Sequence, residues 1–433
     1  MTNTPNDVLL AIGSGLKLYR EYLVKSVAAR ARSRGLDLVL LNNIEPTWQH
    51  EYFDEIVVAN VFDHQILADR AREIAGRRHV VGLMCWDEPL VQPAAEMAEE
   101  LGVPGLSSLG VRGCRDKNRT RQVLTAAGLV QPHFELTTSL EQARTVADRI
   151  GYPVVVKPQA LGASMGVVRA DDRAELDAAF TTATSASAIG DEPFRGTAIV
   201  EEYAVGPEIS IDAAVYKGEY LPMFLARKRT GMEPYFEEVG HLVDAADPLL
   251  EDEVLLDTLA EAHRELGVEN GITHTEVRLT ARGPLIIEVN GRLGGDLIPF
   301  LGKIATGIDP GEVLVDVATG HRPSTTPTQR AAAGIRFGYP EHDCVVRSVT
   351  VPEHGPGLVT AAVMVEPGAE LRLPPGGYIA RHSFVVCEAS DSPRCDELLK
   401  AASASVELVG DPLEPLAAGA TFTLPAGLLD ADK

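Results

Sequence analysis

The stretch HTEVRLTARGPLIIEVNGRLGGD, residues 274–296, contains two runs in which apolar and polar residues alternate. This alternation predicts two half-buried strands, and Ala-Arg-Gly-Pro at 281–284 supplies the turn between them. A three-residue turn centred on Arg282 sets Glu276 directly opposite Glu288. Because like charges that face each other across a sheet repel, a divalent cation is the expected partner of this pair.

Three side chains of this hairpin, Glu276, Glu288 and Asn290, offer oxygen ligands on one sheet face. Hard oxygen ligands suit magnesium, which commonly shares phosphate oxygens as well. Two solvent-facing acids are the alternative interpretation, but the apolar flanks of both runs favour the metal. Arg292 follows closely, and its guanidinium is placed to hold a transferring phosphoryl group or an acyl phosphate, unless it forms a salt bridge with a neighbouring carboxylate.

The bulk properties of the chain restrict the classes of function that remain open. Its 433 residues predict two to four domains, and its formal charge of −23 argues against non-specific binding to nucleic acid or to an anionic membrane. We expect no signal peptide, because the start lacks a basic segment followed by a long apolar run, and no membrane span, because no apolar run approaches ~18 residues. Five scattered cysteines without a CxxC pair suit free thiols in a reducing compartment.

Residues 7–110 alternate short apolar runs with helical stretches, which predicts a parallel α/β layer. Further along, the segment LGASMGV places Gly162 and Gly166 among small residues between two predicted strands. Such a loop lets backbone N–H groups approach phosphate oxygens closely, although a glycine-rich turn alone is commonly only a turn. Lys157, at the end of the preceding strand, and Lys117, inside a predicted helix, strengthen the phosphate interpretation in an otherwise acidic chain.

The segment IVEEYAVGPEISID, residues 199–212, predicts one strand that ends near Glu201 and a second that begins near Glu208. A short connector of this kind exposes backbone groups that can pair with an adenine edge, and an acidic side chain beside it can accept from ribose hydroxyls. A surface turn with solvated acids is the alternative for this segment taken alone.

Taken in order, DKNRTR, VVVKP, the 162–166 glycine loop, VEEYAVGPE, TEV and EVNGR resemble the motif series of the ATP-grasp superfamily. Each motif is weak by itself, whereas the ordered set from Lys117 to Arg292 is strong. Within that superfamily, FEEVGH at 236–241 is similar to a segment of the L-amino acid ligases, the dipeptide-forming branch. The tail from about 332 to 410 loosely resembles the C-terminal domain of the same branch.

The resemblance implies an α/β and α+β multidomain fold. Its expected parts are a Rossmann-like lead domain (1–112), a small α+β lid subdomain with the glycine loop (113–195), a large α+β subdomain with the magnesium site (196–325) and a C-terminal α+β domain (326–433). ATP is then expected between the small and large subdomains.

The resemblance also implies roles for individual residues. ATP contacts fall on Lys117, Lys157, Gly162, Ser164, Gly166, Glu201, Glu202, Tyr203, Ala204, Glu208 and Lys228. The expected magnesium ligands are Glu276, Glu288 and Asn290. The residues expected to contact the substrate are Glu238, His241, Arg292, Gly294 and Gly295. Arg292 and Lys157 are the expected catalytic residues.

The implied activity is an ATP-dependent carbon–nitrogen ligase with ATP and Mg²⁺, or Mn²⁺ in its place, as cofactors. A carboxylate, expected to belong to an amino acid, becomes an acyl phosphate, and an amine then displaces phosphate. The expected partners are small-molecule carboxylates and amines, and neither nucleic acid nor a membrane is expected. The expected location is the cytoplasm, and a homodimer is an open possibility. Two alternatives also stay open: another ATP-grasp ligase, of the bicarbonate-, formate-activating or purine-pathway type, and a non-catalytic ATP-binding regulator.

Overall fold

The computed structural model describes residues 7–188 and 192–414, and it begins with the predicted parallel α/β layer. Its sheet has the order β3-β2-β1-β4 with all neighbours parallel. The strands are β1 (Val8–Ile12), β2 (Asp37–Asn42), β3 (Glu55–Val58) and β4 (Val80–Cys85); the helices are α1 (Lys17–Ser33), α2 (His64–Arg77) and α3 (Val91–Leu101). All five residues of β1 are buried, as expected for a central strand covered on both faces.

Two helices lead from this layer into a small antiparallel sheet of order β5-β8-β6-β7. The elements are α4 (Ser108–Arg115), α5 (Lys117–Ala126), β5 (Phe134–Thr137), α6 (Leu140–Ile150), β6 (Val154–Pro158), β7 (Val168–Ala170), α7 (Arg173–Ser187) and β8 (Ala198–Glu202). Asp116 caps α5 as predicted, because its carboxylate accepts from the N–H groups of Asn118 and Arg119. Since β8 belongs to this sheet, the small sheet extends beyond the boundary expected at 195/196.

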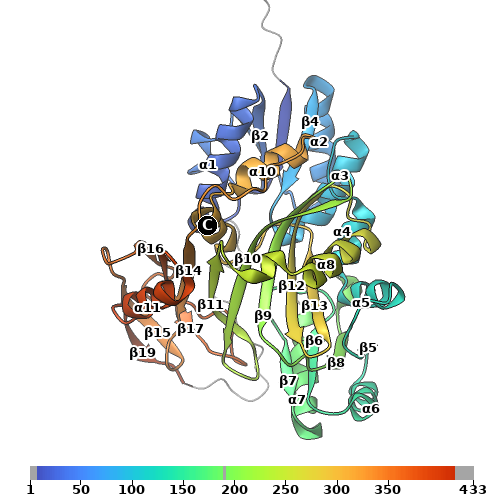
Figure 1. The fold of residues 1–433 in the computed structure, drawn as a ribbon, viewed down its shortest axis with the longest axis vertical. Coiled ribbons are helices and arrows are strands. Elements are labelled where there is room, and N and C mark those ends of the chain that lie inside the picture. Colours follow the sequence, from blue (N-terminus) through green and yellow to red (C-terminus); the bar gives the residue numbers. More distant parts are fainter. Residues whose placement is uncertain (1–6, 189–191, 415–433) are drawn as a thin grey trace, which may run out of the picture.

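The centre of the molecule is an eight-stranded sheet of order β13-β12-β9-β10-β11-β14-β18-β16 (Figure 1). Its strands in chain order are β9 (Glu208–Tyr216), β10 (Glu219–Gly231), β11 (Glu237–Asp244), β12 (Gly271–Thr280), β13 (Gly283–Asn290), β14 (Ala332–Gly338), β16 (Leu358–Val363) and β18 (Ser383–Ala389). Three strands of the C-terminal region therefore continue the sheet that carries the hairpin. The boundary expected at 325/326 does not separate two sheets.

The remaining C-terminal strands form a separate small sheet of order β17-β15-β19. They are β15 (Cys344–Thr350), β17 (Glu370–Leu371) and β19 (Glu407–Pro412), and α11 (Ser392–Ser403) packs against β14 and β18. In Figure 1 this region lies at the left, the small lid sheet at the lower right and the parallel layer at the top.

Three further helices cover the large sheet: α8 (Glu253–Glu265), α9 (Ile298–Thr306) and α10 (Pro310–Ala318). α10 packs against α1 of the first layer (Figure 1). At this contact Asp316 accepts from Arg30 and Arg34 at 2.6 Å each. Short 3₁₀ turns occupy Gln49–Glu51, Glu88–Leu90, Glu192–Phe194 and Pro248–Glu251. The contact between α1 and α10 ties the N-terminal layer to the strands that carry the hairpin.

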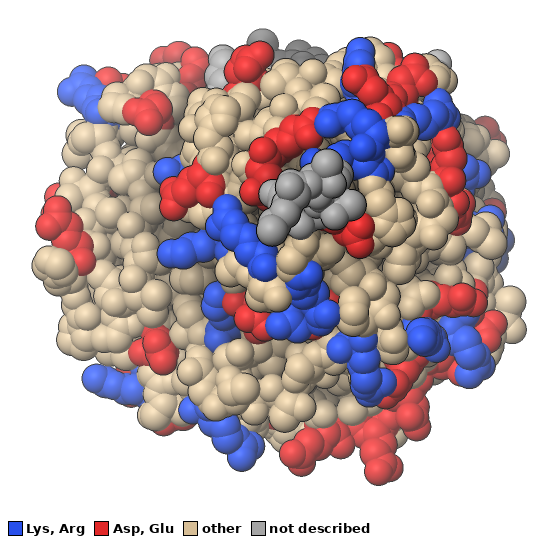
Figure 2. Space-filling view, turned by 90° about the horizontal axis from the view of Figure 1, so that it is seen from above, with Lys and Arg blue, Asp and Glu red and all other residues tan. Residues whose placement is uncertain are grey.

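Acidic and basic side chains are interspersed on the face drawn in Figure 2, which is the end of the molecule with the parallel layer. In the described part of the chain, every helix is too short or too polar to cross a bilayer. All five cysteines are unpaired, as predicted.

Candidate active site

The hairpin of β12 and β13 sets Glu276 opposite Glu288, as the sequence predicted. The predicted turn is wrong, because Thr280 already pairs with Gly283 and only residues 281–282 lie between the strands. With a two-residue turn and a regular ladder, every partner would differ by one residue from the predicted register.

A β-bulge restores the facing pair. Val277 pairs with Ile286, whereas Glu276 pairs with Glu288, so Ile287 is the additional residue on β13. The turn is one residue shorter than predicted and the bulge supplies one residue more. The two carboxylates therefore reach the same face by a route that alternation alone does not reveal.

A buried lysine accompanies each of the two carboxylates. Lys117 Nζ lies 2.9 Å from Glu288 and also donates to the carbonyl of Leu161 at 2.6 Å. Lys228 Nζ lies 2.9 Å from Glu276. The carboxylates keep 14% and 20% of their side-chain surface exposed, whereas both lysines are buried. A pair of partly open acids on one face, with Asn290 next along β13, fits a magnesium ion.

Lys228 is surrounded by three acids. Its ammonium lies 2.8 Å from Glu208, 2.6 Å from Glu238 and 2.9 Å from Glu276. Burial opposes the charge of this lysine, but the three carboxylates outweigh it and raise its pKa well above the usual value. Glu208 is also held by Arg278 at 2.7 Å, so the residue expected at the ribose already carries two cations.

Two of the residues expected to contact the nucleotide, Lys157 and Glu201, lie on β6 and β8 of the small sheet. Lys157 Nζ lies 2.5 Å from Glu201, which also accepts from Arg121 Nε at 3.1 Å. Burial is the main cause that lowers the pKa of Lys157 to about 8, since one carboxylate offsets it only in part and Arg121 adds repulsion. Arg121 further donates to the carbonyls of Ile286 and Ile287 and so links the small sheet to the hairpin.

The glycine loop joins β6 to β7 beside Lys117. Ala163, Ser164 and Gly166 all have positive φ (56°, 54° and 73°), and Val167 N–H donates to the carbonyl of Ser164 at 3.1 Å. A Cβ on Gly166 would lie 2.5 Å from the Cβ of Ala186, whereas one on Gly162 would meet nothing within 4 Å. Glycine is therefore required at 166 by conformation and by space, and the loop stays close to the phosphate-binding candidates.

The segment expected to read adenine, residues 201–204, begins with the last two residues of β8 and continues into the connector to β9. Glu202 N–H donates to His133 and Tyr203 N–H to Pro153, so two of its amides are already bonded within the small subdomain. The ring of Tyr203 stacks on Phe236 and lies under the guanidinium of Arg169 at 4.6 Å. Ala204 carries the next amide of this segment and is buried.

Arg292 has the salt bridge that the sequence left open as an alternative. Its Nε donates to Glu88 at 2.5 Å, and Arg115 lies 3.5 Å from the same acid. Burial opposes both charges, but their pairing raises the pKa of Arg292 and lowers that of Glu88. Sequence reasoning missed Glu88. The available signal was its position just beyond the carboxyl end of β4, where open parallel sheets place binding residues.

Asp212 on β9 organises the segment that follows β13. It lies 2.9 Å from His274 Nδ1 and accepts from the N–H of Gly294 at 2.6 Å. A Cβ on Gly294 would lie 2.8 Å from His274 Nδ1, so this glycine allows the close approach, while Gly295 has open space around its α-carbon. Burial opposes the charge of His274, yet Asp212 and Glu276 raise its pKa to about 9.

The expected substrate side contains two acids that the structure brings to His241. Its Nε2 lies 3.4 Å from Glu238, which was predicted, and 3.1 Å from Asp296, which was not predicted as a site residue. Burial disfavours a charged His241, but these hydrogen bonds prevail and raise its pKa. Asp296 is in turn gripped by Arg381, which comes from the C-terminal region. The sequence offered no spacing signal that links positions 296 and 381.

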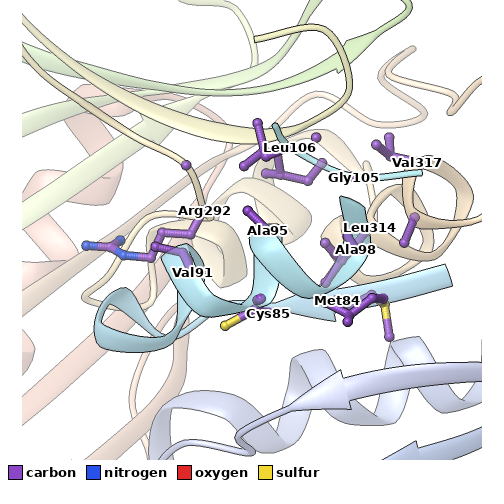
Figure 3. Close-up of a pocket in the computed structure, with 16 residues that line it drawn as sticks. Met84, Cys85, Val91, Ala95, Ala98, Gly105, Leu106, Arg292, Leu314 and Val317 are labelled. Carbon is purple, nitrogen blue, oxygen red and sulfur yellow. The ribbon is translucent and has the colours of Figure 1, made fainter. Parts of the chain in front are cut away.

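A small apolar cavity of about 60 Å³ lies behind this site, between α3, α10 and the hairpin. Met84, Cys85, Ala95, Leu106 and Leu314 line it (Figure 3). Arg292 stands at its edge with the guanidinium directed away from the apolar side chains, toward Glu88 (Figure 3). The predicted nucleotide and magnesium residues do not line this cavity.

Comparisons with known proteins agree with this arrangement. Residues 150–299 match the family model described as an ATP-grasp domain. A protein of Sinorhizobium fredii named y4rH, whose function is uncharacterised, is 28% identical over 78% of this chain and 70% of its own length. The alanine–anticapsin ligase of Bacillus subtilis is 27% identical over 62% of this chain, and the alignment spans only 59% of that ligase.

Solved structures show the same fold over nearly the whole chain. The L-amino acid ligase from Bacillus licheniformis superimposes with a TM-score of 0.78 at 22% identity, covering 94% of this chain and all of that one. The biotin carboxylase domain of a Hydrogenobacter thermophilus 2-oxoglutarate carboxylase, solved with MgADP, gives 0.69 at 18% identity, covering 94% and 92%. The family match over residues 150–299 lies largely within the motif series from Lys117 to Arg292, so this part of the chain contains an ATP-grasp domain.

Proposed function

We propose that this protein is an ATP-dependent, ADP-forming ligase that joins a carboxylate to an amine. The observation that carries the proposal is the facing pair Glu276 and Glu288, each partly exposed and each accompanied by a buried lysine. Such a constellation suits a metal–triphosphate complex, because the acids take the metal and nearby ammonium groups take phosphate oxygens. Magnesium, or manganese in its place, would be held by these acids and Asn290 and would offset the charge that develops on the phosphates.

The roles of the chain's own residues follow from their positions. Lys117 and Lys157 would bind and orient the phosphates, and the loop around Gly166 would close over them and exclude water from the reactive intermediate. The segment 201–204 would hold the adenine by its backbone, with Tyr203 anchored on Phe236. Arg292 would exchange part of its contact with Glu88 for the oxygens of the acyl phosphate.

The reaction would proceed in two displacements. A substrate carboxylate oxygen attacks the γ-phosphorus of ATP, and the bond to the β–γ bridging oxygen breaks to give an acyl phosphate and ADP. The amine of the second substrate then attacks the acyl carbon, loses a proton and expels phosphate. The product contains an amide bond, and most of the protein's contribution is positioning and electrostatic stabilisation.

We further propose that both substrates are small and that at least one is an amino acid. Support comes from the likeness to the alanine–anticapsin ligase and to the L-amino acid ligase. Glu238 and His241 would then face the substrate, since they lie beside Glu276 on the same surface of the large sheet. The five unpaired cysteines support a cytoplasmic location.

The test is a screen of the purified protein with MgATP and all pairs of the proteinogenic L-amino acids, measured as phosphate release. We expect release that depends on at least one pair, accompanied by ADP and abolished by EDTA. Replacing the amine with hydroxylamine should trap an amino-acyl hydroxamate. Formation of AMP, or turnover only with bicarbonate or formate, would contradict the proposal.

A further inference from the structure

Arg381 is a C-terminal residue that reaches the substrate side of the site. It lies just before β18, and its guanidinium donates to both oxygens of Asp296, from Nη1 at 2.6 Å and from Nη2 at 2.8 Å. A third nitrogen, Nε, donates to the hydroxyl of Tyr339 at 3.0 Å. The guanidinium also lies 3.8 Å from the ring centre of Phe337. Its direction is therefore defined by a bidentate ion pair, a hydroxyl and an aromatic face.

Asp296 adopts a conformation that needs such support. Its φ is +53° and that of Leu297 is +62°, so two consecutive residues other than glycine occupy the left-handed region. Such backbone costs free energy and persists where the surroundings hold it in place. Here the holding contacts are Arg381 on one side and His241, 3.1 Å away, on the other. Loss of Arg381 would release the carboxylate that faces His241.

The charges on this side of the site are arranged in two layers. The acids Glu238 and Asp296 keep 14% and 18% of their side-chain surface exposed. The basic side chains behind them are more deeply buried: Lys228 at 2%, His241 at 0% and Arg381 at 6%. The open surface is thus formed by carboxylates, and buried basic side chains fix where those carboxylates point.

These three residues, Glu238, His241 and Asp296, are also close enough together to hold a metal ion. The positions of the cations argue against that use. Lys228 already pairs with Glu238, and Arg381 pairs with Asp296 through two hydrogen bonds. Burial disfavours the charge of Asp296, but Arg381 and His241 prevail and hold its pKa well below the usual value. A metal would have to displace or repel both cations.

We propose that Arg381 is a positioning residue that holds Asp296, and with it His241 and Glu238, so that the C-terminal region shapes the substrate side of the ligase site. The inference rests on the proposed function, because it assigns these residues to the substrate rather than to the nucleotide. We therefore expect substitutions of Arg381 to change the KM for the carboxylate substrate and not the KM for ATP.

The experiment compares Arg381→Met and Arg381→Lys with the wild type. The carboxylate substrates are the twenty proteinogenic L-amino acids, hydroxylamine is the amine, and hydroxamate formation is the readout. We expect Arg381→Met to raise the KM for the accepted amino acid about tenfold or more while the KM for ATP changes less than about twofold. Arg381→Lys, which keeps the charge without the bidentate geometry, should recover part of the loss.

Arg372→Met is the matched control. Arg372 is a similarly buried C-terminal arginine, with 10% of its side chain exposed, whose acid partners, each at 3.5 Å, are Asp343 and Glu370 and not Asp296. This variant should keep wild-type values of both KM parameters. If Arg381→Met fails to fold, Tyr339→Phe removes only the hydroxyl that accepts from Arg381 Nε and should raise the amino-acid KM about two- to threefold.

Each other outcome is decisive. A wild-type amino-acid KM in a folded Arg381→Met protein, or in Tyr339→Phe if Arg381→Met does not fold, overturns the inference and leaves the ligase proposal intact. Equal losses for ATP and amino acid also overturn it, because they indicate general damage. Binding of Zn²⁺ by the wild type that Asp296→Asn abolishes would identify a metal site instead. Absence of ADP formation by the wild type with every amino-acid pair would defeat the ligase proposal itself, and this inference with it.

Discussion

Two buried lysines, Lys157 on the small sheet and Lys228 on the large sheet, look alike in the sequence but occupy opposite electrostatic environments. Lys157 shares Glu201 with Arg121, and its pKa is lowered to about 8, chiefly because of burial. Lys228 has three acids within 3 Å, and its pKa is raised well above the usual value despite burial. Both were expected to bind phosphate.

The difference separates two uses of the same side chain. Lys157 lacks sufficient negative charge, so an additional anion such as a phosphate would stabilise its charged form. Lys228 already has an excess of negative charge around it, and a phosphate would have to compete with three carboxylates. The contrast favours Lys157 over Lys228 as the proposed phosphate ligand, whereas the observed contacts of Lys228 are with the three acids.

The largest effect should come from removing the central cation. Lys228→Met leaves three partly buried carboxylates without their common, deeply buried partner, and breaking a buried ion pair costs about 3–5 kcal/mol. We expect the free energy of unfolding to fall by that order, measured by urea denaturation. Lys25→Met, at an exposed position on α1, is the control and should stay within about 0.5 kcal/mol. A Lys228→Met protein with the wild-type free energy of unfolding would contradict the stabilising role that distinguishes Lys228 from Lys157.

The next largest effect concerns the metal pair. Glu288→Gln removes one predicted magnesium ligand and the acid partner of Lys117, and we expect kcat to fall about 10²- to 10³-fold. The assay is ADP formation at limiting magnesium, with Glu251→Gln at an exposed turn as the control. Near-normal turnover in Glu288→Gln would remove these carboxylates from the mechanism.

A pH titration of nucleotide binding would sharpen the comparison. Below pH 8 the free protein carries charged Lys157, and above pH 8 the lysine loses its proton. Because bound phosphate favours the charged form, the Kd for ADP should rise above pH 8, up to about tenfold per pH unit. In the Lys157→Arg variant this rise in the Kd should be absent from the accessible pH range, since arginine stays charged. A Kd that is flat between pH 7 and 9.5 in the wild type would contradict the role given to Lys157.

The smallest effect is expected in the loop that Lys157 precedes. Gly166→Ala places a Cβ 2.5 Å from Ala186 Cβ at a φ of +73°, so we expect a loss of about 1–2 kcal/mol in the free energy of unfolding. Gly162→Ala meets no atom within 4 Å and should change stability by less than about 0.5 kcal/mol. Equal free energies of unfolding for the two variants would show that the loop rearranges easily to accommodate a Cβ at position 166.

Much of the fold followed from the sequence because the signals were local. The parallel layer, the hairpin and the cap of α5 at Asp116 were predicted from alternation and capping residues, and the structure confirms them. The turn length was wrong because a bulge beside Glu276 is invisible to a strict two-residue period. The sequence also did not show that β14, β16 and β18 extend the central sheet, since such pairings join residues far apart in the chain.

The candidate site was also predicted only in part. Residues that belong to the ordered motif series, from Lys117 to Arg292, could be identified from the sequence. Glu88 and Arg381 could not, because each acts through a contact between segments separated by more than 80 residues. Pairing partners were the weakest point: the sequence suggested solvated or ligand-binding charges, whereas the structure shows Glu208 and Glu201 already engaged with buried cations.

Because of the bulge, the facing of Glu276 and Glu288 depends on the exact number of residues in the hairpin. Turn and bulge together determine which side chains of β12 and β13 share a face, so inserting or deleting a single residue between positions 277 and 287 would invert one acid relative to the other. Changes of two residues, or a compensating second bulge, would preserve the pair. Relatives that keep the facing acids should therefore vary the length of this hairpin in even steps, and an odd step without compensation should identify a descendant that has lost the pair proposed to hold the metal.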